Sequence, residues 1–168
     1  SLLDSSLYRS KMANCESRQE TYQVQLDSGE SISYQIRGLR SDDEIQEWAT
    51  FCASVFSYKP NPPPPSYFER HYYHDPARVA SLVRVAICND EMVASCRLFL
   101  RTLSAGVSAG GIGEVCTRTD HQRRGLSKIL LQNVIEIMKE RQLQVSMLHA
   151  APTFFPFYEK AGGYVCST

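Results

Sequence analysis

The residues of this sequence best suited to chemistry are gathered in a polar turn, residues 118–124, that contains three arginines. The turn follows an apolar strand pattern and precedes an apolar helix pattern. Where a strand leads into a helix, the first backbone N–H groups of the helix have no partner within it, and the helix dipole adds positive potential. Such a helix start binds anions, most often phosphate. Gly125 lets a ligand approach the backbone, and Arg123 and Arg124 add positive charge, so we expect a phosphate site here.

The spacing of the surrounding residues excludes two common phosphate-binding motifs. A Walker A loop has Gly-Lys followed by Ser or Thr, whereas the order from Gly125 onward is Gly-Leu-Ser-Lys. A dinucleotide-binding fingerprint would need a glycine at the position of Cys116. The phosphate ligand must therefore be held by another kind of loop.

The segment Gln122–Ser127 resembles the Gln/Arg-x-x-Gly-x-Gly/Ala signature of the GCN5-related N-acetyltransferase (GNAT) superfamily, with Ser127 at a position that is Gly or Ala in the signature. The segment 157–164 resembles the second signature of this superfamily, a Phe-Tyr-Glu-Lys-x-Gly-Phe/Tyr ending, with one extra glycine. The resemblance covers roughly residues 31–166. The turn 121–126 is most similar to the enhanced-intracellular-survival type, whose members modify aminoglycosides and other amines. Because such proteins usually continue past the last strand, we expect either a minimal protein or a C-terminally truncated one.

The resemblance implies an acetyl-CoA-dependent enzyme that transfers the acetyl group to a primary amine by direct attack, without a metal. The loop would hold the pyrophosphate, and the strand edge at Val115–Thr117 would pair with the pantetheine arm and polarise the thioester carbonyl. The expected acetyl-CoA-binding residues are Val115, Cys116, Thr117, Gln122, Arg123, Arg124, Gly125, Leu126 and Ser127.

The reaction also needs a base for the incoming ammonium and an acid for the leaving thiolate. Glu114, Asp120 and His149 are candidate bases, and Glu114 is favoured because it is a lone carboxylate in a strand directed at the site, where burial would raise its pKa. The alternative for Glu114 is a charge on an exposed strand face. Tyr158 is the expected general acid, since a phenol stays protonated at neutral pH. The alternative for Tyr158 is a half-buried ring that anchors its helix by one hydrogen bond.

The acceptor amine is left open by the sequence: a polyamine, an aminoglycoside, an amino acid or a peptide N-terminus. Tyr67 and Tyr72, with the neighbouring proline run, are expected beside the acceptor entrance. The run could instead be a stiff connector or a ligand for a partner protein. Two other functions remain as alternatives, a catalytically silent acyl-CoA-binding sensor or scaffold and an interaction domain that uses the proline run. Formation of a homodimer is also open.

Composition restricts the partners of the protein. The chain of 168 residues has zero net charge, so neither nucleic acid nor an anionic membrane surface is an expected partner. No apolar run approaches the ~20 residues of a membrane span, and no signal-peptide pattern is present. The six cysteines lack CxxC spacing and are expected to be reduced core thiols, which indicates a cytoplasmic protein.

Two further constellations are weak. Cys116 with His121 or His149 would suit a nucleophilic hydrolase, but no other motif indicates one. The spacing of His71 and His74 would suit a metal, but no third ligand is evident, so hydrogen-bonded or solvated histidines are expected.

The remaining pattern predicts one α/β domain over residues 21–168, preceded by a polar tail or expression remnant over 1–20. The expected elements are a hairpin (22–26 and 32–36), a helix after a capping box at Ser41 and Glu44 (45–56), an extended proline run (60–65), a helix (66–74), a hairpin (81–88 and 92–103), a loop (104–110), a strand (112–117), a helix (126–141), a strand (143–150), a helix (151–161) and a strand (164–166). Arg97 and Arg101 share one face of the second hairpin, which is expected to be solvated, with an anion clamp as the alternative. This order, like the resemblance, predicts a GNAT-like fold with a central mixed, mostly antiparallel sheet flanked by helices.

Overall fold

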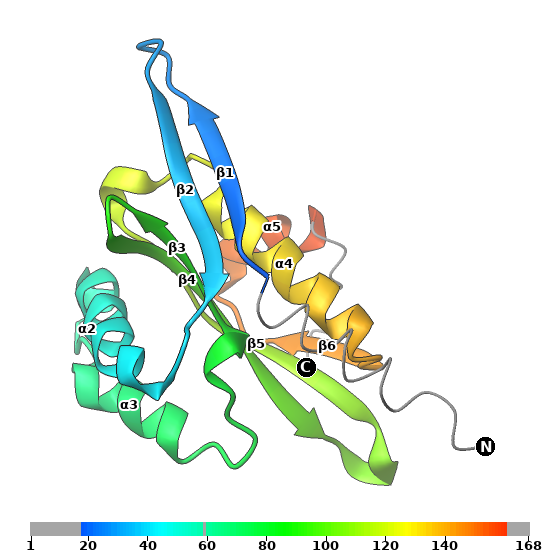
Figure 1. The fold of residues 1–168 in the computed structure, drawn as a ribbon. Coiled ribbons are helices and arrows are strands. Elements are labelled where there is room, and N and C mark those ends of the chain that lie inside the picture. Colours follow the sequence, from blue (N-terminus) through cyan, green and yellow to red (C-terminus); the bar gives the residue numbers. More distant parts are fainter. Residues whose placement is uncertain (1–17, 59, 161–168) are drawn as a thin grey trace.

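The computed structural model describes residues 18–58 and 60–160, which form a sheet of six strands in the order β1-β2-β3-β4-β5-β6 (Figure 1). The strands are β1 (Glu20–Gln25), β2 (Ser31–Gly38), β3 (Val83–Cys88), β4 (Glu91–Thr102), β5 (Ser108–Thr117) and β6 (Val145–Leu148). Neighbouring strands are antiparallel from β1 to β5, and β6 runs parallel to β5. The expected mixed, mostly antiparallel sheet is therefore confirmed.

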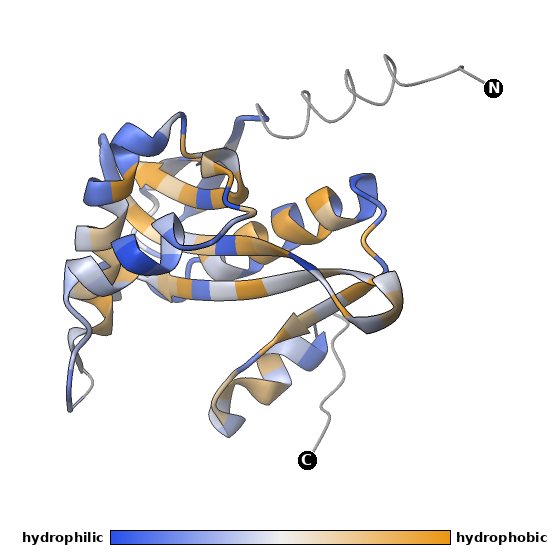
Figure 2. Ribbon diagram, turned by 90° about the horizontal axis from the view of Figure 1, so that it is seen from below, coloured by the Kyte–Doolittle hydropathy of each residue, from blue (hydrophilic) through white to orange (hydrophobic). Residues whose placement is uncertain are grey.

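Helices cover both faces of this sheet (Figure 1). They are α2 (Ile45–Val55), α3 (Pro65–Tyr73), α4 (Leu126–Glu140) and α5 (Phe155–Lys160), with short 3₁₀ turns η1 (Asp42–Glu44), η2 (Phe56–Tyr58), η3 (Ala80–Leu82), η4 (Ser104–Gly106), η5 (Thr119–His121) and η6 (Pro152–Phe154). Strand residues alternate between two cores, one on each face of the sheet. Figure 2 shows hydrophobic residues along the strands and along the helices beside them. Val85 contributes to the core under α2 and α3, whereas Ala86 contributes to the core under α4.

The elements expected from periodicity are present, with shifted ends. The β3–β4 hairpin turns at Asn89 and Asp90, whose φ angles of 50° and 64° fit the two-residue turn that such hairpins favour. Pro64 is extended (φ −71°, ψ 164°) and Pro65 is the first residue of α3. The expected last strand, 164–166, lies outside the described residues. Within the described part of the chain, the model contains no helix of the length and apolarity that crossing a membrane requires.

The start of β5 differs from the expectation of a loop over residues 104–110. Ser108 pairs with Thr102 and Gly110 pairs with Leu100, so the strand begins at Ser108. Glycine here reflects packing, because a Cβ at Gly110 would lie 2.6 Å from the terminal methyl carbon of Met138 on α4. Gly110 therefore lets α4 approach the sheet closely, whereas Gly106 lies in the turn η4 with open space around it.

The expectation that Arg97 lies on a solvated strand face is wrong. Its side chain is only 2% exposed and pairs with Asp75 at 3.0 Å between Nη2 and Oδ2. The guanidinium also lies over the ring of Phe99, at 4.1 Å from the centroid, and over the ring of Tyr72, at 5.1 Å. Because α3 and the turn after it cover this face of β4, the arginine is buried, and an ion pair is what makes such burial tolerable.

The capping box before α2 is formed only in part. The Ser41 hydroxyl accepts a hydrogen bond from the Asp43 N–H, as a cap should. Glu44 does not return to the Ser41 backbone; it accepts from the Arg37 guanidinium and from the Arg40 N–H. The carboxylate therefore joins the end of β2 to the helix start, because a buried arginine is a stronger donor than a backbone amide.

Candidate active site

The expected anion site lies at the junction of β5 and α4. Gly125 is the residue before the helix and has a left-handed conformation (φ 79°), which glycine adopts without strain. No side chain caps this helix start, so its first N–H groups are directed outward without a side-chain acceptor. The Ser127 hydroxyl lies 2.9 Å from the Thr117 hydroxyl on β5. Serine at this position therefore turns back to the strand and leaves the backbone surface open.

Residues far away in the sequence support this loop from behind. The Tyr22 hydroxyl donates to the Arg124 carbonyl at 3.3 Å, and Arg124 Nη1 donates to the Tyr34 hydroxyl at 2.7 Å. The same hydroxyl lies 3.0 Å from His121 Nδ1. Burial lowers the pKa of His121, and the nearby Arg124 and Arg118 lower it further although Asp120 acts in the opposite direction. A neutral imidazole thus joins the sheet to the loop.

The two arginines of the loop differ in their surroundings. Arg124 is partly buried and directs Nη1 to the Tyr34 hydroxyl and to His121 Nδ1, so it stabilises the loop. Arg123 is exposed and has a φ angle of 62°. Of the two arginines, Arg123 is therefore the one positioned to add charge at the surface.

A glycine replacement tests the site. Gly125→Glu is expected to abolish measurable coenzyme A binding, because a side chain and a like charge would occupy the pyrophosphate position. Gly29→Glu is the matched control, since Gly29 has a similar φ angle (85°) but open space around its missing Cβ, whereas a Cβ at Gly125 would lie 2.9 Å from the Tyr22 hydroxyl. In calorimetric titrations the control should bind coenzyme A with the affinity of the parent. Coenzyme A at 100 times its Kd should raise the free energy of unfolding of both proteins by ~2.7 kcal/mol. A folded Gly125→Glu protein that binds with parental affinity would show the assignment to be wrong.

A β-bulge in β5 presents Glu114. Ser95 pairs with Cys116 and Arg97 pairs with Gly113, so Cys96 on β4 faces two residues, Glu114 and Val115. Glu114 has a φ angle of 46°, which is unusual for a residue with a side chain. The bulge thus redirects a carboxylate that an unbroken strand would place differently.

The environment of Glu114 is that of a functional acid or base. Its side chain is 8% exposed and lies 3.8 Å from His71 Nδ1. Burial raises the pKa of Glu114 to about 7, against the opposing effect of Arg97 and with a smaller contribution from Asp75. The alternative of an exposed strand face is therefore wrong. Within residues 18–58 and 60–160, Glu114 Oε2 is buried and has no hydrogen-bond partner.

The other candidate bases lie in less suitable places. Asp120 is exposed and bound by Arg118, and His149 is exposed. Cys116, considered as a nucleophile, is buried in the core under α2 and α3. Glu114 is the one of these groups that is both buried and beside a cavity.

The outer edge of β5 is free where the thioester would lie. Strand β6 pairs with β5 only as far as Ile112, opposite Leu148. Beyond that point none of the strands in the described part of the chain pairs with this edge, which includes Val115 and Thr117. An extended ligand such as a pantetheine arm could pair there as an added strand.

Tyr158 lies near the bulge on the opposite side of the sheet from Glu114. It is partly buried and packs against the core under α4. Burial, and to a smaller extent the Cys96 thiol, raises the pKa of Tyr158. Burial, with a smaller effect of Glu114, likewise raises the pKa of Cys96. Cys96, the residue opposite the bulge, therefore interacts electrostatically with both Tyr158 and Glu114. The hydroxyl makes no hydrogen bond to a described residue, which disfavours the role of a hydrogen-bonded helix anchor.

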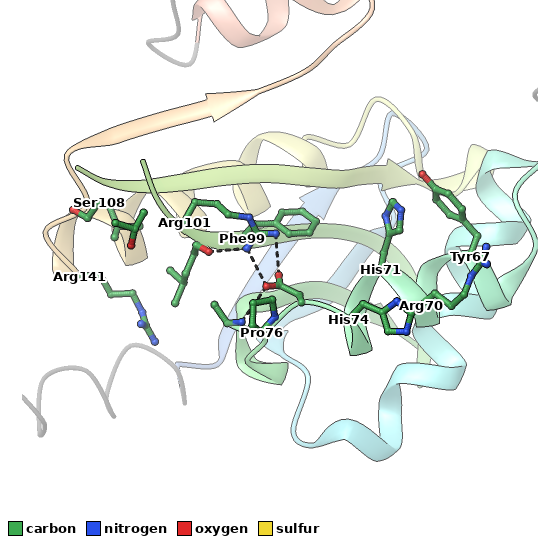
Figure 3. Close-up of a pocket in the computed structure, with 14 residues that line it drawn as sticks. Tyr67, Arg70, His71, His74, Pro76, Phe99, Arg101, Ser108 and Arg141 are labelled. Atoms are coloured by element: carbon green, nitrogen blue, oxygen red, sulfur yellow. Dashed lines mark hydrogen bonds and ion pairs between the residues drawn. The ribbon is translucent and has the colours of Figure 1, made fainter. Parts of the chain in front are cut away.

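A groove of about 1070 Å³ lies beside Glu114, between α3, β4, the start of β5 and the turn after α4 (Figure 3). Tyr67 and His71 lie at one end, and Ser108 and Arg141 lie at the other. His71 connects the groove to Glu114. No residue of the proline run lines this groove, so the run is not a wall of it.

Of the two tyrosines expected at the acceptor entrance, only Tyr67 lines the groove. Tyr72 is 1% exposed, and its hydroxyl donates to Asp42 at 2.6 Å. The expectation for Tyr72 is therefore wrong. A helix turns by about 100° per residue, so residues five apart cannot share a face, and this spacing already placed the two rings on different sides of α3.

Comparison with solved structures identifies the fold. Glucosamine-6-phosphate N-acetyltransferase from Arabidopsis thaliana superposes with a TM-score of 0.61 and 16% identity, over 80% of this chain and 94% of that one. A GCN5-related N-acetyltransferase from Ralstonia eutropha gives 0.62 and 16%, over 80% and 95%. A protein from Clostridium acetobutylicum, described as a predicted acetyltransferase and solved with acetyl-CoA, gives 0.60 and 16%, over 79% and 90%. The fold is that of acetyltransferases.

The family follows from the sequence itself. A family model described as an acetyltransferase (GNAT) domain matches residues 35–165, and the chain belongs to this family. No curated protein matches the chain. These comparisons do not support the narrower resemblance to the enhanced-intracellular-survival type. Among the described residues, no group of three or more His, Cys, Asp or Glu side chains could hold a metal ion.

Proposed function

We propose that this protein transfers the acetyl group of acetyl-CoA to a primary amine by direct attack. The observation that carries the proposal is the position of Glu114. This buried carboxylate stands at the bulge of β5, three residues before Thr117 and the anion loop, and beside the groove through His71. Such a place lies between a bound thioester and an entering amine.

Backbone groups would perform much of the catalysis. The N–H groups at the start of α4 would bind the pyrophosphate, and the free edge of β5 would hold the pantetheine arm. A backbone N–H at this edge would stabilise the developing oxyanion, a contribution typically worth ~3 kcal/mol.

Two side chains would then move the protons. Glu114, with a pKa near the pH of the cell interior, accepts a proton from the ammonium of the acceptor. The neutral amine attacks the thioester carbon, and the tetrahedral intermediate collapses with cleavage of the C–S bond. Tyr158, on the other side of the sheet, donates its proton to the departing thiolate. The nitrogen gives up its remaining extra proton, which returns through solvent to the Tyr158 phenolate, and Glu114 releases its proton to solvent.

The test uses acetyl-CoA, a thiol-detecting dye and a panel of primary amines. Thiol release that depends on the amine supports the transferase. Stabilisation of the protein by coenzyme A without turnover would instead support a silent acyl-CoA-binding module, and neither effect would favour an interaction domain.

The two tyrosines of α3 give a paired prediction. Tyr67→Ala is expected to raise the KM of the acceptor several-fold and leave the KM of acetyl-CoA unchanged, because Tyr67 lines the groove. The Tm should fall only a little, since the ring contacts Phe68 and His71 but is 37% exposed. Tyr72→Ala should instead destabilise the protein by about 3–5 kcal/mol, since it removes a fully buried ring. Steady-state kinetics and thermal unfolding separate the two effects. Equal effects of Tyr67→Ala on both KM values would exclude its acceptor role.

A further inference from the structure

We propose that the acceptor is a small primary amine that also carries an anionic group, a carboxylate or a phosphate, and that Arg101 binds this group. The inference rests on the proposed function and names its substrate class. It comes from the charge of the groove and from the arrangement of Arg101 within it.

Positive charge dominates the groove. Three arginines, Arg70, Arg101 and Arg141, line it together with a single carboxylate, Asp75. That carboxylate is already engaged, with Oδ2 3.0 Å from Arg97 and Oδ1 2.9 Å from Arg101. Burial alone would raise the pKa of Asp75, but the hydrogen bonds and charges of the two arginines lower it, so it remains ionised. A free carboxylate on an acceptor therefore has arginines to meet, whereas a polycation would be repelled.

Arg101 is held in place for such a contact. Nη1 and Nη2 both donate to Asp75, and Nη1 also donates to the Leu100 carbonyl, which uses three of the five N–H groups of a guanidinium. The side chain is still 41% exposed, and its guanidinium lies 5.2 Å from the centre of the Phe99 ring. A guanidinium that is fixed by its neighbours loses little entropy when it binds an anion.

The distance to Glu114 sets the size of the acceptor. Arg101 pairs with Ala109, five residues before Glu114, and a strand rises about 3.3 Å per residue, so the two backbone levels are about 16 Å apart. The Arg101 guanidinium shortens this span, because it lies 5.2 Å from the centre of the Phe99 ring beside it (Figure 3), and a Cβ at Gly113 would lie 2.7 Å from Cε2 of the same ring. An amine at Glu114 and an anion at Arg101 would therefore be the two ends of an elongated small molecule that lies across Phe99.

Matched amine pairs test this proposal. 8-Aminooctanoate and heptylamine differ by a carboxylate at the far end of the chain from the amine, and glucosamine 6-phosphate and glucosamine differ by a phosphate. In at least one pair the anionic member is expected to have a kcat/KM about 10-fold or more higher, the effect of one charged hydrogen bond. The ratio of kcat/KM between the anionic and the uncharged amine should fall as potassium chloride is added, because salt screens the charge interaction. The pair that shows the preference identifies the anion as carboxylate or phosphate.

Variants locate the effect. Arg101→Gln should reduce the preference to within a few-fold, and Arg101→Lys, which keeps the charge and loses the fork, should give an intermediate ratio. Arg78→Gln is the matched control, because Arg78 is exposed and does not line the groove. Equal or better use of the uncharged members by the parent protein would overturn the proposal even if the Arg101 variants failed to fold.

Binding distinguishes this failure from failure of the proposed function. If no amine is acetylated, calorimetric titration of each pair into the protein saturated with coenzyme A still measures the preference. Selective binding of the anionic member without turnover would overturn the transferase activity and keep the binding site. Absence of selective binding would overturn the site itself.

Discussion

Tyr158→Phe is expected to lower kcat by about 10²–10⁴-fold, the usual contribution of acid catalysis, with little change in the Kd of coenzyme A. The change deletes only the hydroxyl and keeps the ring that packs against the core under α4. Because the hydroxyl makes no hydrogen bond within the described residues, its loss should leave the Tm almost unchanged. A thiolate whose conjugate acid has a pKa of ~8.5 is a poor leaving group in an apolar site, so the donor matters most there.

The control for this variant is Tyr73→Phe on α3. Tyr73 is 46% exposed and does not line the groove, so the same chemical change should leave all kinetic constants near those of the parent. The comparison requires single-turnover conditions, in which chemistry limits the rate. If Tyr158→Phe stays within a few-fold of the parent there, Tyr158 is a structural residue.

Glu114→Gln is expected to lower kcat/KM by about 10²–10⁴-fold and to change the pH dependence. A base acts as the carboxylate, so the activity of the parent should be present above pH 7 and fall as the pH drops through the pKa of about 7. The variant should lose this acidic limb, because glutamine does not titrate. Glu47→Gln, at an exposed position of α2, is the control. An unchanged acidic limb in Glu114→Gln would assign the base to another residue.

The same substitution should stabilise the protein at alkaline pH. The pKa of Glu114 rises from 4.5 to about 7 on folding, so between these values the folded state binds more protons than the unfolded state and stability falls as the pH rises. Above pH 7 the buried, ionised Glu114 carboxylate lowers the free energy of unfolding by an amount on the order of 3 kcal/mol. Glutamine carries no charge and avoids this loss. The Tm of the variant should therefore exceed the Tm of the parent at pH 8, and the two Tm values should match at pH 4. A stabilised but inactive variant would identify a residue retained for chemistry.

Local pattern was enough for the elements and for part of the site. The strand-turn-helix around Gly125 and the β3–β4 hairpin follow from periodicity and motif spacing. Periodicity left the burial of Glu114 open against an exposed strand face, because the bulge that directs this side chain is not visible in the pattern. The support of the loop by Tyr22 and Tyr34 does not, because these contacts join residues 102 and 90 positions apart. The burial of Arg97 with Asp75 likewise depends on how α3 covers β4, and alternation along a strand does not indicate which face is covered.

The β1–β2 hairpin bears on where this domain begins. The family match starts at residue 35, after Tyr22 and Tyr34, although both tyrosines bind Arg124 of the loop. A fragment cut at that boundary would keep every residue of the family signatures and lose both hydroxyls that position the loop. The β1–β2 hairpin, of which the family match covers only the second half of β2, is therefore a structural support of the loop that we propose to bind acyl-CoA.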